Sequence, residues 1–571
     1  MPSRRGPCAA LPGRLTWCAG PAANAGGKPE REGGIVTRVT VLDRARTVAT
    51  PQFNRWLVPP AALCIHLCIG MAYGFSVFWL PMAHLITHAN PAVCAAQGFL
   101  AQLTTTQCNW SVPTEAHIFE TFIAVLGISA AIWGGWLEHA GPRKAGFIAA
   151  LCWGGGLIAG GVGVSLHQLW IVYLGAGVLG GVGQGLGYIT PVSTLIKWFP
   201  DRRGLATGFA IMGYGGGAMI GAPLAVWLMA RFAHHGVQGV SASLVILGVI
   251  YFAVMAVGAF GFRVPPAGWH PEGYTPTEAE SERSMITRRH VHLGRALRTP
   301  QFWLIWLVLC LNVTAGIGVI SMASPMLQDV FGAKLIHRVA LSPGAQEAAI
   351  VAAAAGLVGL ISLFNSLGRL FWAASSDYIG RKRTYYTFFV VGIGLYVLLP
   401  TWGRLGAPGL FVLSVCIILT MYGGGFSTLP AYLADIFGTQ MVGAIHGRLI
   451  TAWSVAGIAG PALIASLRQY ELDHGIARAQ VYNLTLYIMA TLLFVGLICN
   501  AFIRPVADRH YMSEQELARE RALQSEQGNA ELGAAAARGK PGFGTALAWL
   551  GVGVPFLIGV WIALSKGLAL F

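Results

Sequence analysis

The stretch Asn365-Ser-Leu-Gly-Arg-Leu-Phe-Trp-Ala-Ala-Ser-Ser-Asp-Tyr-Ile-Gly-Arg-Lys-Arg383 decides how the rest of the sequence is interpreted. It closes an apolar run that begins near Ala348, and it ends in a basic turn after Asp377. Arg369 stands inside the apolar part, eight residues before Asp377, which is about 12 Å along a helix. A full charge at that depth is costly, so it marks a site for an anion or a partner carboxylate.

The composition of the 571-residue chain predicts a protein that crosses a membrane several times. Hydrophobic residues make up 55% of it and charged residues 11%, whereas soluble domains carry about 25% charged residues. The 75 glycines favour close packing of helices in lipid. The net charge of +15 is spread over loops and tails, so we expect a lipid bilayer as partner and no nucleic acid.

Apolar runs long enough to span a bilayer follow one another along the chain. The first six lie near 57–82, 117–137, 145–166, 169–192, 204–230 and 242–262. The next six lie near 302–327, 348–374, 385–402, 409–433, 448–467 and 481–503, with a last run at 543–565. The predicted fold class is therefore all-α and integral to the membrane, with two six-helix halves and an extra C-terminal helix.

The predicted organisation divides the chain into six parts. They are a disordered basic cytoplasmic tail (1–55), an N-terminal half (56–262), a cytoplasmic linker (263–300), a C-terminal half (301–503), a second cytoplasmic linker (504–541) and an additional transmembrane helix (542–571). No apolar leader occurs before Trp56, so we expect no secretory signal peptide.

The placement of Lys and Arg predicts the orientation. Both linkers, the tail and the basic turns fall on one side, whereas the long loop 83–116 on the other side contains no Lys or Arg. We therefore expect the N-terminus to be cytoplasmic. Cys94 and Cys108 then lie on the outer side, where they form either a disulfide or two free thiols.

The two halves repeat each other at an offset near 240 residues. In Gly134-Gly-Trp-Leu-Glu-His-Ala-Gly-Pro-Arg-Lys144 and in Ala373-Ala-Ser-Ser-Asp-Tyr-Ile-Gly-Arg-Lys-Arg383, an acid ends a span, a glycine follows three residues later, and basic residues close the turn. Gly185–Pro191 likewise parallels Gly424–Pro430. Duplicated halves of this kind are typical of transporters that hold their substrate near the midplane.

The repeated acid-x-x-Gly-basic turn resembles the signature loop of the major facilitator superfamily, although Glu138 stands where that family usually has Asp. Within the superfamily, Gly368-Arg-Leu-Phe-Trp372 and His446-Gly-Arg-Leu-Ile-Thr-Ala-Trp453 resemble the oxalate/formate antiporter family. The resemblance implies transport of small organic anions by alternating-access exchange, in a bacterial inner membrane. The run after Ala546 is similar to a one-span subunit that accompanies some such transporters.

The resemblance also implies a role for Arg369, because an arginine of span eight binds the substrate carboxylate in that family. A guanidinium forks onto a carboxylate and stays charged; the alternative is a structural arginine that pairs with backbone carbonyls or with Asp377. Oxalate-specific members share a lysine on span eleven, and here its place falls at or beside Trp453. One central cation suits a monoanion better than a dianion, so formate, pyruvate or lactate is as good a candidate as oxalate.

Other polar groups on the spans that face the pore could complete a substrate-binding pocket with Arg369. For each alone, helix packing is the plainer interpretation. The candidates are Tyr73, Tyr188, Asn312, Asn365, Tyr422 and Trp453. We also expect Glu138 with Arg143, and Asp377 with Arg381, to act as gating pairs that close the cytoplasmic side; basic residues that only fix the topology are the alternative.

A carrier that couples to protons needs a titratable group in the membrane interior, and the candidates are few: Glu120 and His66. This scarcity favours exchange and leaves a proton-coupled monocarboxylate symporter as the alternative. A carboxylate sensor that no longer transports is disfavoured, and a drug exporter has no use for a buried arginine. No nucleotide-binding, metal-ligand or catalytic pattern occurs, so we expect no cofactor, no metal and no enzyme activity. The sequence is compatible with a monomer.

Overall fold

The computed structural model describes residues 40–50, 52–86, 94, 98–234, 237, 239–266, 269–271, 285–336, 343–526 and 542–567. All of them belong to the unit Thr40–Phe571. In these residues the regular structure is helical, apart from isolated bridges such as the one between Val48 and Val264. This confirms the predicted all-α fold class.

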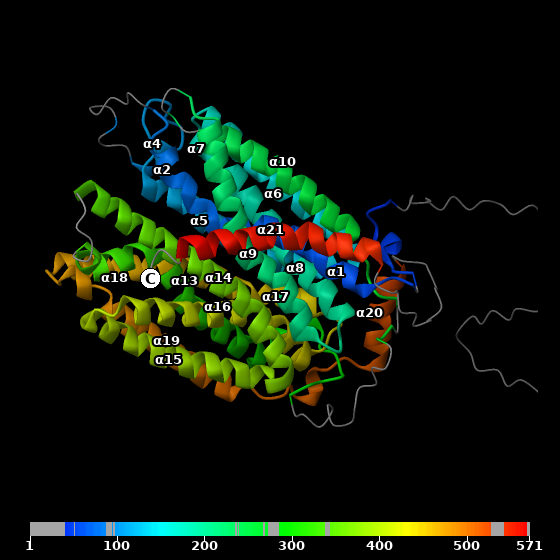
Figure 1. Ribbon diagram of the computed structural model, residues 1–571. Helices are drawn as coiled ribbons and strands as arrows, with labels where there is room; N and C mark the ends of the chain where they lie inside the picture. The colour runs from blue at the N-terminus through cyan, green and yellow to red at the C-terminus, as the bar shows by residue number, and fades with distance from the viewer. Residues whose placement is uncertain are drawn as a thin grey trace, which may run out of the picture. The chain divides into compact units, whose positions relative to one another are not determined.

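Six helical rods make the first half (Figure 1). They are α1 (Val58–Ile69) with its continuations η3 (Gly70–Phe78) and α2 (Trp79–Met82), α5 (Val112–Ala140), α6 (Pro142–Ser165), α7 (Leu169–Val172) with η4 (Tyr173–Leu179) and α8 (Gly180–Trp198), α9 (Arg203–Arg231), and α10 (Val240–Gly261).

Six further rods make the second half, and one helix follows them. They are α13 (Pro300–Ile336), α14 (Pro343–Ile379), α15 (Arg381–Leu405), α16 (Pro408–Phe437), α17 (Val442–Leu449) with α18 (Thr451–Asp473), α19 (Asn483–Phe502), and the additional α21 (Phe543–Gly567). In the described part of the chain, twelve helices are long and apolar enough to cross a membrane, α21 among them. The 37-residue α14, packed between α9 and α16, completes the second six.

The repeated turn has the same backbone in both halves. Gly141 has a φ of 86° and Gly380 a φ of 91°, a region that side chains other than glycine rarely adopt. Each glycine N–H donates to the carbonyl four residues earlier, Leu137 and Ser376 respectively, and so closes the preceding helix. The glycine three residues after the acid is therefore what ends one rod and starts the next.

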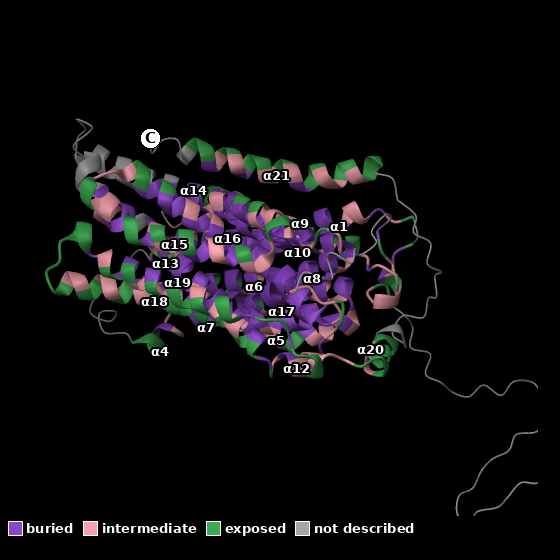
Figure 2. Ribbon diagram, turned by 90° about the horizontal axis from the view of Figure 1, so that it is seen from below, coloured by how far each residue is buried: buried purple, intermediate pink, exposed green. Residues whose placement is uncertain are grey.

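The two halves meet along two pairs of helices. On one side α9 packs against α14, and on the other α5 packs against α17 and α18. Buried residues gather in the middle of the bundle, between these pairs (Figure 2). We call the end that carries the turns at Gly141 and Gly380 the basic end; Cys94 and Cys108, which form a disulfide, lie at the opposite end.

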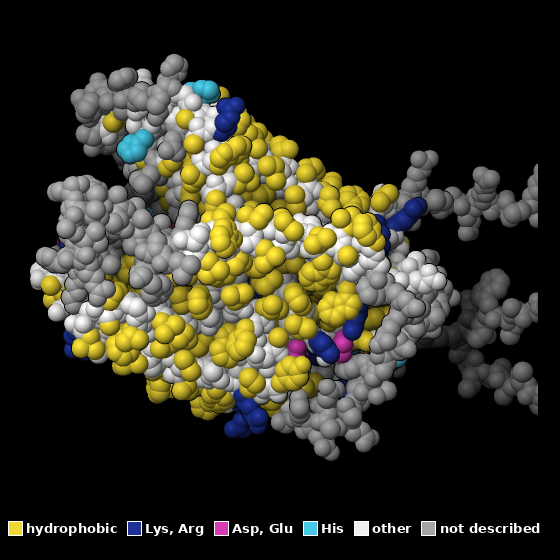
Figure 3. All heavy atoms as spheres, viewed as in Figure 1, with side chains coloured by type: hydrophobic (Ala, Val, Ile, Leu, Met, Phe, Trp, Pro, Cys, Tyr) yellow, Lys and Arg dark blue, Asp and Glu magenta, His cyan; other side chains and the backbone are white. Residues whose placement is uncertain are grey.

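Helix α21 lies along α9 and α14, so it touches both halves (Figure 1). Trp549 contacts the ring of Phe209 at 5.5 Å, and a side chain on Gly559 would meet Met219 at 3.1 Å. Its other face is exposed and forms part of a largely hydrophobic surface (Figure 3). The sequence predicts such a surface for a helix in contact with lipid.

The N-terminal tail is not wholly disordered as predicted. Residues 1–39 and 51 lie outside the described residues, but residues 40–50 and 52–55 are docked at the basic end. Arg44 donates to the carbonyl of Glu138, and Ala49 N–H donates to the carbonyl of Val264 at 2.9 Å. The prediction is wrong for this segment, because its basic side chains are held by backbone carbonyls of the bundle.

Candidate functional site

Arg369 lies on α14, ten residues before the basic end of that helix, and it is fully buried. Its guanidinium donates to Asn365 Oδ1 (3.1 Å), to the Ile211 carbonyl (3.4 Å) and to the Tyr73 hydroxyl (3.5 Å). None of these three groups carries a negative charge. Among the described residues the arginine thus makes neutral contacts only, in a region where an uncompensated charge is expensive.

Asp377, the alternative partner, is engaged elsewhere. Its oxygens accept from the backbone N–H groups of Gly204 (2.9 Å) and Leu205 (3.0 Å) and from the Arg381 guanidinium (2.6 Å). The interpretation that Arg369 pairs with Asp377 is therefore wrong. Backbone contact does occur, through the Ile211 carbonyl.

Six aromatic side chains from both halves surround the arginine, and we call them the aromatic cluster. The cluster consists of Tyr73, Tyr188, Tyr214, Tyr422, Phe426 and Trp453. The Arg369 guanidinium carbon lies 5.6 Å from the Tyr214 ring centre and 5.3 Å from that of Phe426, within the range of cation–π attraction. The Tyr73 and Tyr422 hydroxyls are 3.0 Å apart and link the halves.

Several buried polar atoms in this region have no hydrogen-bond partner among the described residues. They are Tyr188 Oη, Tyr214 Oη, Trp453 Nε1, Ser366 Oγ and Asn312 Nδ2. Buried polar groups are almost always paired in proteins. The indole and amide nitrogens can only donate, and the hydroxyls can donate. A bound anion would neutralise the guanidinium, which has no acidic partner among the described residues. It would also accept hydrogen bonds from these unused donors.

The predicted residues do not all lie equally close to Arg369. Tyr73 and Asn365 contact it directly, and Tyr422 contacts Tyr73. Tyr188 and Trp453 reach it through Tyr214, whose ring lies 5.5 and 5.3 Å from theirs. These five form one connected group around the guanidinium.

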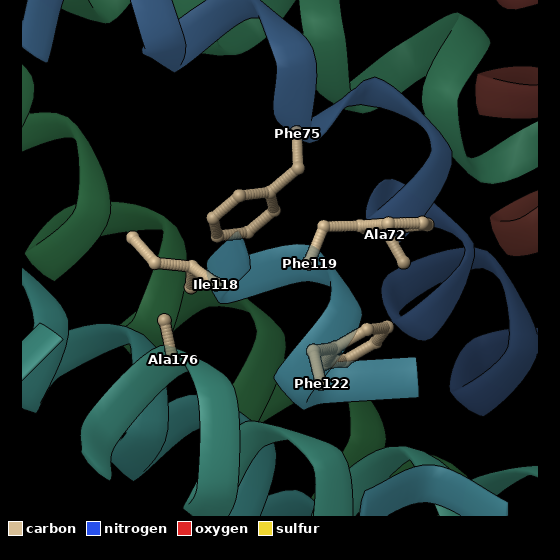
Figure 4. A pocket seen from close by; sticks show the side chains of 6 residues that line it. All are labelled: Ala72, Phe75, Ile118, Phe119, Phe122 and Ala176. Atoms are coloured by element: carbon tan, nitrogen blue, oxygen red, sulfur yellow. The ribbon is translucent and has the colours of Figure 1, made fainter. Parts of the chain in front are cut away.

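Asn312 lies further out. It lines a small cavity beside Tyr422, and a side chain on Gly425 would meet its Nδ2 at 2.4 Å. A second cavity, near η3 and α5, has only hydrophobic walls (Figure 4). It is lined by Ala72, Phe75, Ile118, Phe119, Phe122 and Ala176. Of the two cavities, the one beside Tyr422 therefore offers an anion a donor.

Sequence reasoning missed Tyr214, Phe426 and Ser366. Tyr214 stands in Gly213-Tyr-Gly-Gly-Gly217 and Phe426 follows Gly423-Gly-Gly425, runs that look like sites of helix packing. The glycines do serve close approach: a side chain on Gly215 would come within 2.8 Å of Ser366 Oγ and 3.1 Å of Arg369 Nε. A large aromatic side chain inside a glycine run was the available signal.

The two predicted gating pairs turn out differently. Asp377 does pair with Arg381, which also reaches Asp435 at 3.2 Å. Glu138 does not pair with Arg143, so that prediction is wrong: Glu138 accepts from Lys197 Nζ at 2.5 Å. Arg143 instead donates to the carbonyl of Val41 at 2.8 Å in the docked tail segment, which sequence patterns around residue 138 could not reveal.

Two acids lie at the N-terminal end of α5, opposite to the basic end. Glu115 precedes the apolar span His117–Ala140, and Glu120 lies near its start. Glu120, the candidate from the sequence, is half-exposed and pairs with His117 at 2.8 Å. Glu115 is fully buried, and neither of its carboxylate oxygens has a partner among the described residues. Burial raises the pKa of Glu115 to about 9, so it is protonated at neutral pH.

Comparison with known proteins gives one family. The sequence profile of the Major Facilitator Superfamily matches residues 62–461. The oxalate:formate antiporter of Oxalobacter formigenes is 28% identical, over 67% of this chain and 82% of its own length. The apicoplast pyruvate carrier 1 of Toxoplasma gondii is 24% identical, over 73% of this chain and 86% of its own length.

Solved structures agree on the fold. A Major Facilitator Superfamily transporter, FucP, solved in the outward conformation, superposes with a TM-score of 0.53 and 11% identity, over 79% of this chain and 100% of its own. At that identity the likeness concerns the arrangement of helices alone. The transporter fold therefore stands on sequence profile and structural likeness together, and the C-terminal α21 is an addition that the profile match does not cover.

Proposed function

Because the chain belongs to the major facilitator superfamily, we propose that it is a secondary transporter that moves small organic anions by alternating access. One observation carries the proposal: Arg369 is fully buried between the halves, and its contacts within the part of the chain that the structure describes are all neutral. A carboxylate beside it would neutralise the guanidinium and accept from the unused donors around it. The substrate would thus supply an acid that none of the described residues places there.

A monocarboxylate fits this site better than oxalate does. The aromatic cluster contributes rings, hydroxyls and an indole N–H, and Arg369 is the cation that the described residues place against it. A second carboxylate would be desolvated without a partner charge, which is costly in a low dielectric. Formate and pyruvate, anions named for two of the relatives, are the first candidates.

Exchange of one anion for another is the proposed mode, since few described acids line the interior. The specific rival is symport of a monocarboxylate with a proton, and one observation favours it: His66 is fully buried close to the aromatic cluster. In both modes the halves rock about Arg369. The contacts at the basic end break when that end opens.

The proposed setting is a bacterial inner membrane with the basic end in the cytoplasm. The support is the excess of Lys and Arg at that end. The disulfide between Cys94 and Cys108 lies at the other end and suits an oxidising compartment.

Proteoliposomes test this function. Vesicles are loaded with unlabelled formate, pyruvate or oxalate, and the entry of labelled anion is measured with and without an imposed pH gradient. We expect entry to require an anion inside, and Arg369→Ala to reduce it about 100-fold or more, as for the loss of one partner of a buried charge pair. Arg448→Ala is the matched control, because Arg448 donates to the Ala444 carbonyl of its own helix, and it should transport normally.

Entry of the anion driven only by a pH gradient would indicate symport with a proton and exclude exchange as the transport mode. Binding of an anion with no entry in either condition would indicate a sensor. Undiminished transport by Arg369→Ala would overturn the site itself.

A further inference from the structure

His66 lies on α1, fully buried, and both of its ring nitrogens face backbone carbonyls. Nδ1 is 2.6 Å from the Ala210 carbonyl oxygen on α9, and Nε2 is 3.2 Å from the Tyr188 carbonyl oxygen on α8. The Gly187 carbonyl also interacts with this ring. That carbonyl lacks its usual helical donor because residue 191 is a proline.

For both ring nitrogens to hydrogen-bond the carbonyl oxygens that they face, each must carry an N–H group. A neutral imidazole has only one, so in either tautomer one ring nitrogen would point its lone pair at a carbonyl oxygen. The imidazolium donates from both nitrogens and is the only form that satisfies both contacts. The backbone around His66 is therefore shaped for the protonated ring.

The charged and titratable groups around His66 do not stabilise a positive charge on its ring. Arg369 on α14 repels it, and His446 on α17 also interacts with it. Tyr188 on α8 and Tyr214 on α9 face the ring at 5.5 and 6.4 Å and are neutral phenols. Helices α10, α21 and α6 also pack against α1. On α10, the titratable Tyr251 interacts with Cys68, two residues along α1 from His66. With the site empty, the positive charge of the guanidinium opposes a second positive charge on the His66 ring.

We propose that His66 takes up a proton when an anion binds at Arg369, so that the transported species is the anion together with this proton. The inference rests on the proposed function, because it needs an anion at Arg369. The anion cancels the guanidinium charge, and the imidazolium then gains its second carbonyl contact without that repulsion. The loaded site carries the same net charge as the empty one, one positive charge in each case, and this holds for exchange and for symport.

Proton uptake on binding is the direct test. Formate and pyruvate are titrated into the purified full-length protein in weak buffer near neutral pH, with a pH indicator to count protons and intrinsic tryptophan fluorescence to count bound anion. We expect about one proton taken up per anion, and a fall in affinity of about tenfold per pH unit between about pH 6 and 8, where both anions stay ionised.

His66→Gln should bind the anion with no proton uptake and with affinity independent of pH. His446→Gln is the matched control, since His446 is equally buried and near Tyr188 but has no partner on either nitrogen among the described residues, and it should keep the uptake.

If His66→Gln fails to fold, the wild-type measurement still tests the proposal, because it must show proton uptake on binding. Binding without proton uptake, or uptake that persists in His66→Gln, would overturn the role of His66 and leave the anion site intact. Absence of binding by folded wild-type protein would overturn the proposed anion site, and with it the proton.

Discussion

The two seams between the halves are built differently although each contains an acid from the repeated turn. In the α9–α14 seam, Asp377 of the second half accepts hydrogen bonds from Gly204 and Leu205 in the first turn of α9. Arg203 of the same turn pairs with Asp435 at 3.0 Å. This seam is held by charges placed at a helix N-terminus, where carboxylates are favoured.

In the α5–α17 seam, Glu138 keeps its hydrogen bonds within its own half. It accepts from Lys197 and from Ser193, both on α8. What holds α5 to α17 is close backbone packing: a side chain on Gly447 would lie 2.2 Å from the Ala130 carbonyl oxygen. The duplication therefore preserved the turn and its glycine, but the acid joins the halves in only one copy.

This difference predicts how the basic end opens. The α9–α14 seam must break charge-assisted hydrogen bonds. The other seam loses close backbone packing and, between α18 and α5, the hydrogen bond from Ser454 Oγ to the Ile123 carbonyl. We expect the α9–α14 seam to govern whether the basic end stays closed, with α21 lying along the same pair of helices.

Asp377→Asn should have the largest effect on this comparison. Asp377 uses one oxygen for Gly204 N–H and the other for Leu205 N–H, and an amide offers only one oxygen. A loss of about 2 kcal/mol corresponds to about thirtyfold faster amide exchange. Hydrogen exchange measured by mass spectrometry on peptides that cover 204–205 checks this.

Asp508→Asn is the control for that experiment, because Asp508 forms an exposed ion pair with Arg289 in the linkers that follow the two halves. It should leave exchange at 204–205 unchanged. Equal protection of these amides in Asp377→Asn and wild type would mean that the acid does not hold the seam.

Gly447→Ala probes the other seam and should have the next largest effect. The added methyl group would meet the backbone oxygen of Ala130, which cannot turn aside, so α17 must move away from α5. Overpacking of this kind costs about 1–3 kcal/mol. The thermal unfolding midpoint of the purified protein should fall.

Gly135→Ala on α5 is its matched control, since a side chain there meets nothing within 4 Å, and alanine is the better helix former. Its midpoint should stay the same or rise. If both variants unfolded at the same temperature, close packing would not be what joins α5 to α17.

The architecture could be predicted from the sequence because its signals are local. Apolar runs give the spans, and the acid with a glycine three residues later gives the turn, since a left-handed residue is needed at Gly141 and Gly380. The docking of residues 40–50 and 52–55 could not be predicted. It depends on carbonyls of Glu138 and Val264, which lie near the tail only in the folded bundle.

The candidate site was predicted in its centre and missed at its edge. Arg369 could be predicted as a site residue because a charge is rare in an apolar run. Its depth within the span is a sufficient signal. Tyr214 was hidden because its neighbours are glycines, and whether it faces lipid or Arg369 depends on how α9 is rotated in the bundle. The partner of Glu138 was hidden for a similar reason, since Lys197 lies 59 residues away along the chain.

Glu138→Gln should have the smallest effect on the seams, and it sharpens the comparison most. The amide keeps an oxygen for Lys197, and Lys197 is partly exposed and can turn to water, so we expect a loss of about 1 kcal/mol within the first half. Exchange should rise about fivefold near Lys197 and stay unchanged at 204–205. If Glu138→Gln increased amide exchange at 204–205 as much as Asp377→Asn does, both acids would stabilise the same contact between the halves. The two seams would then be equivalent.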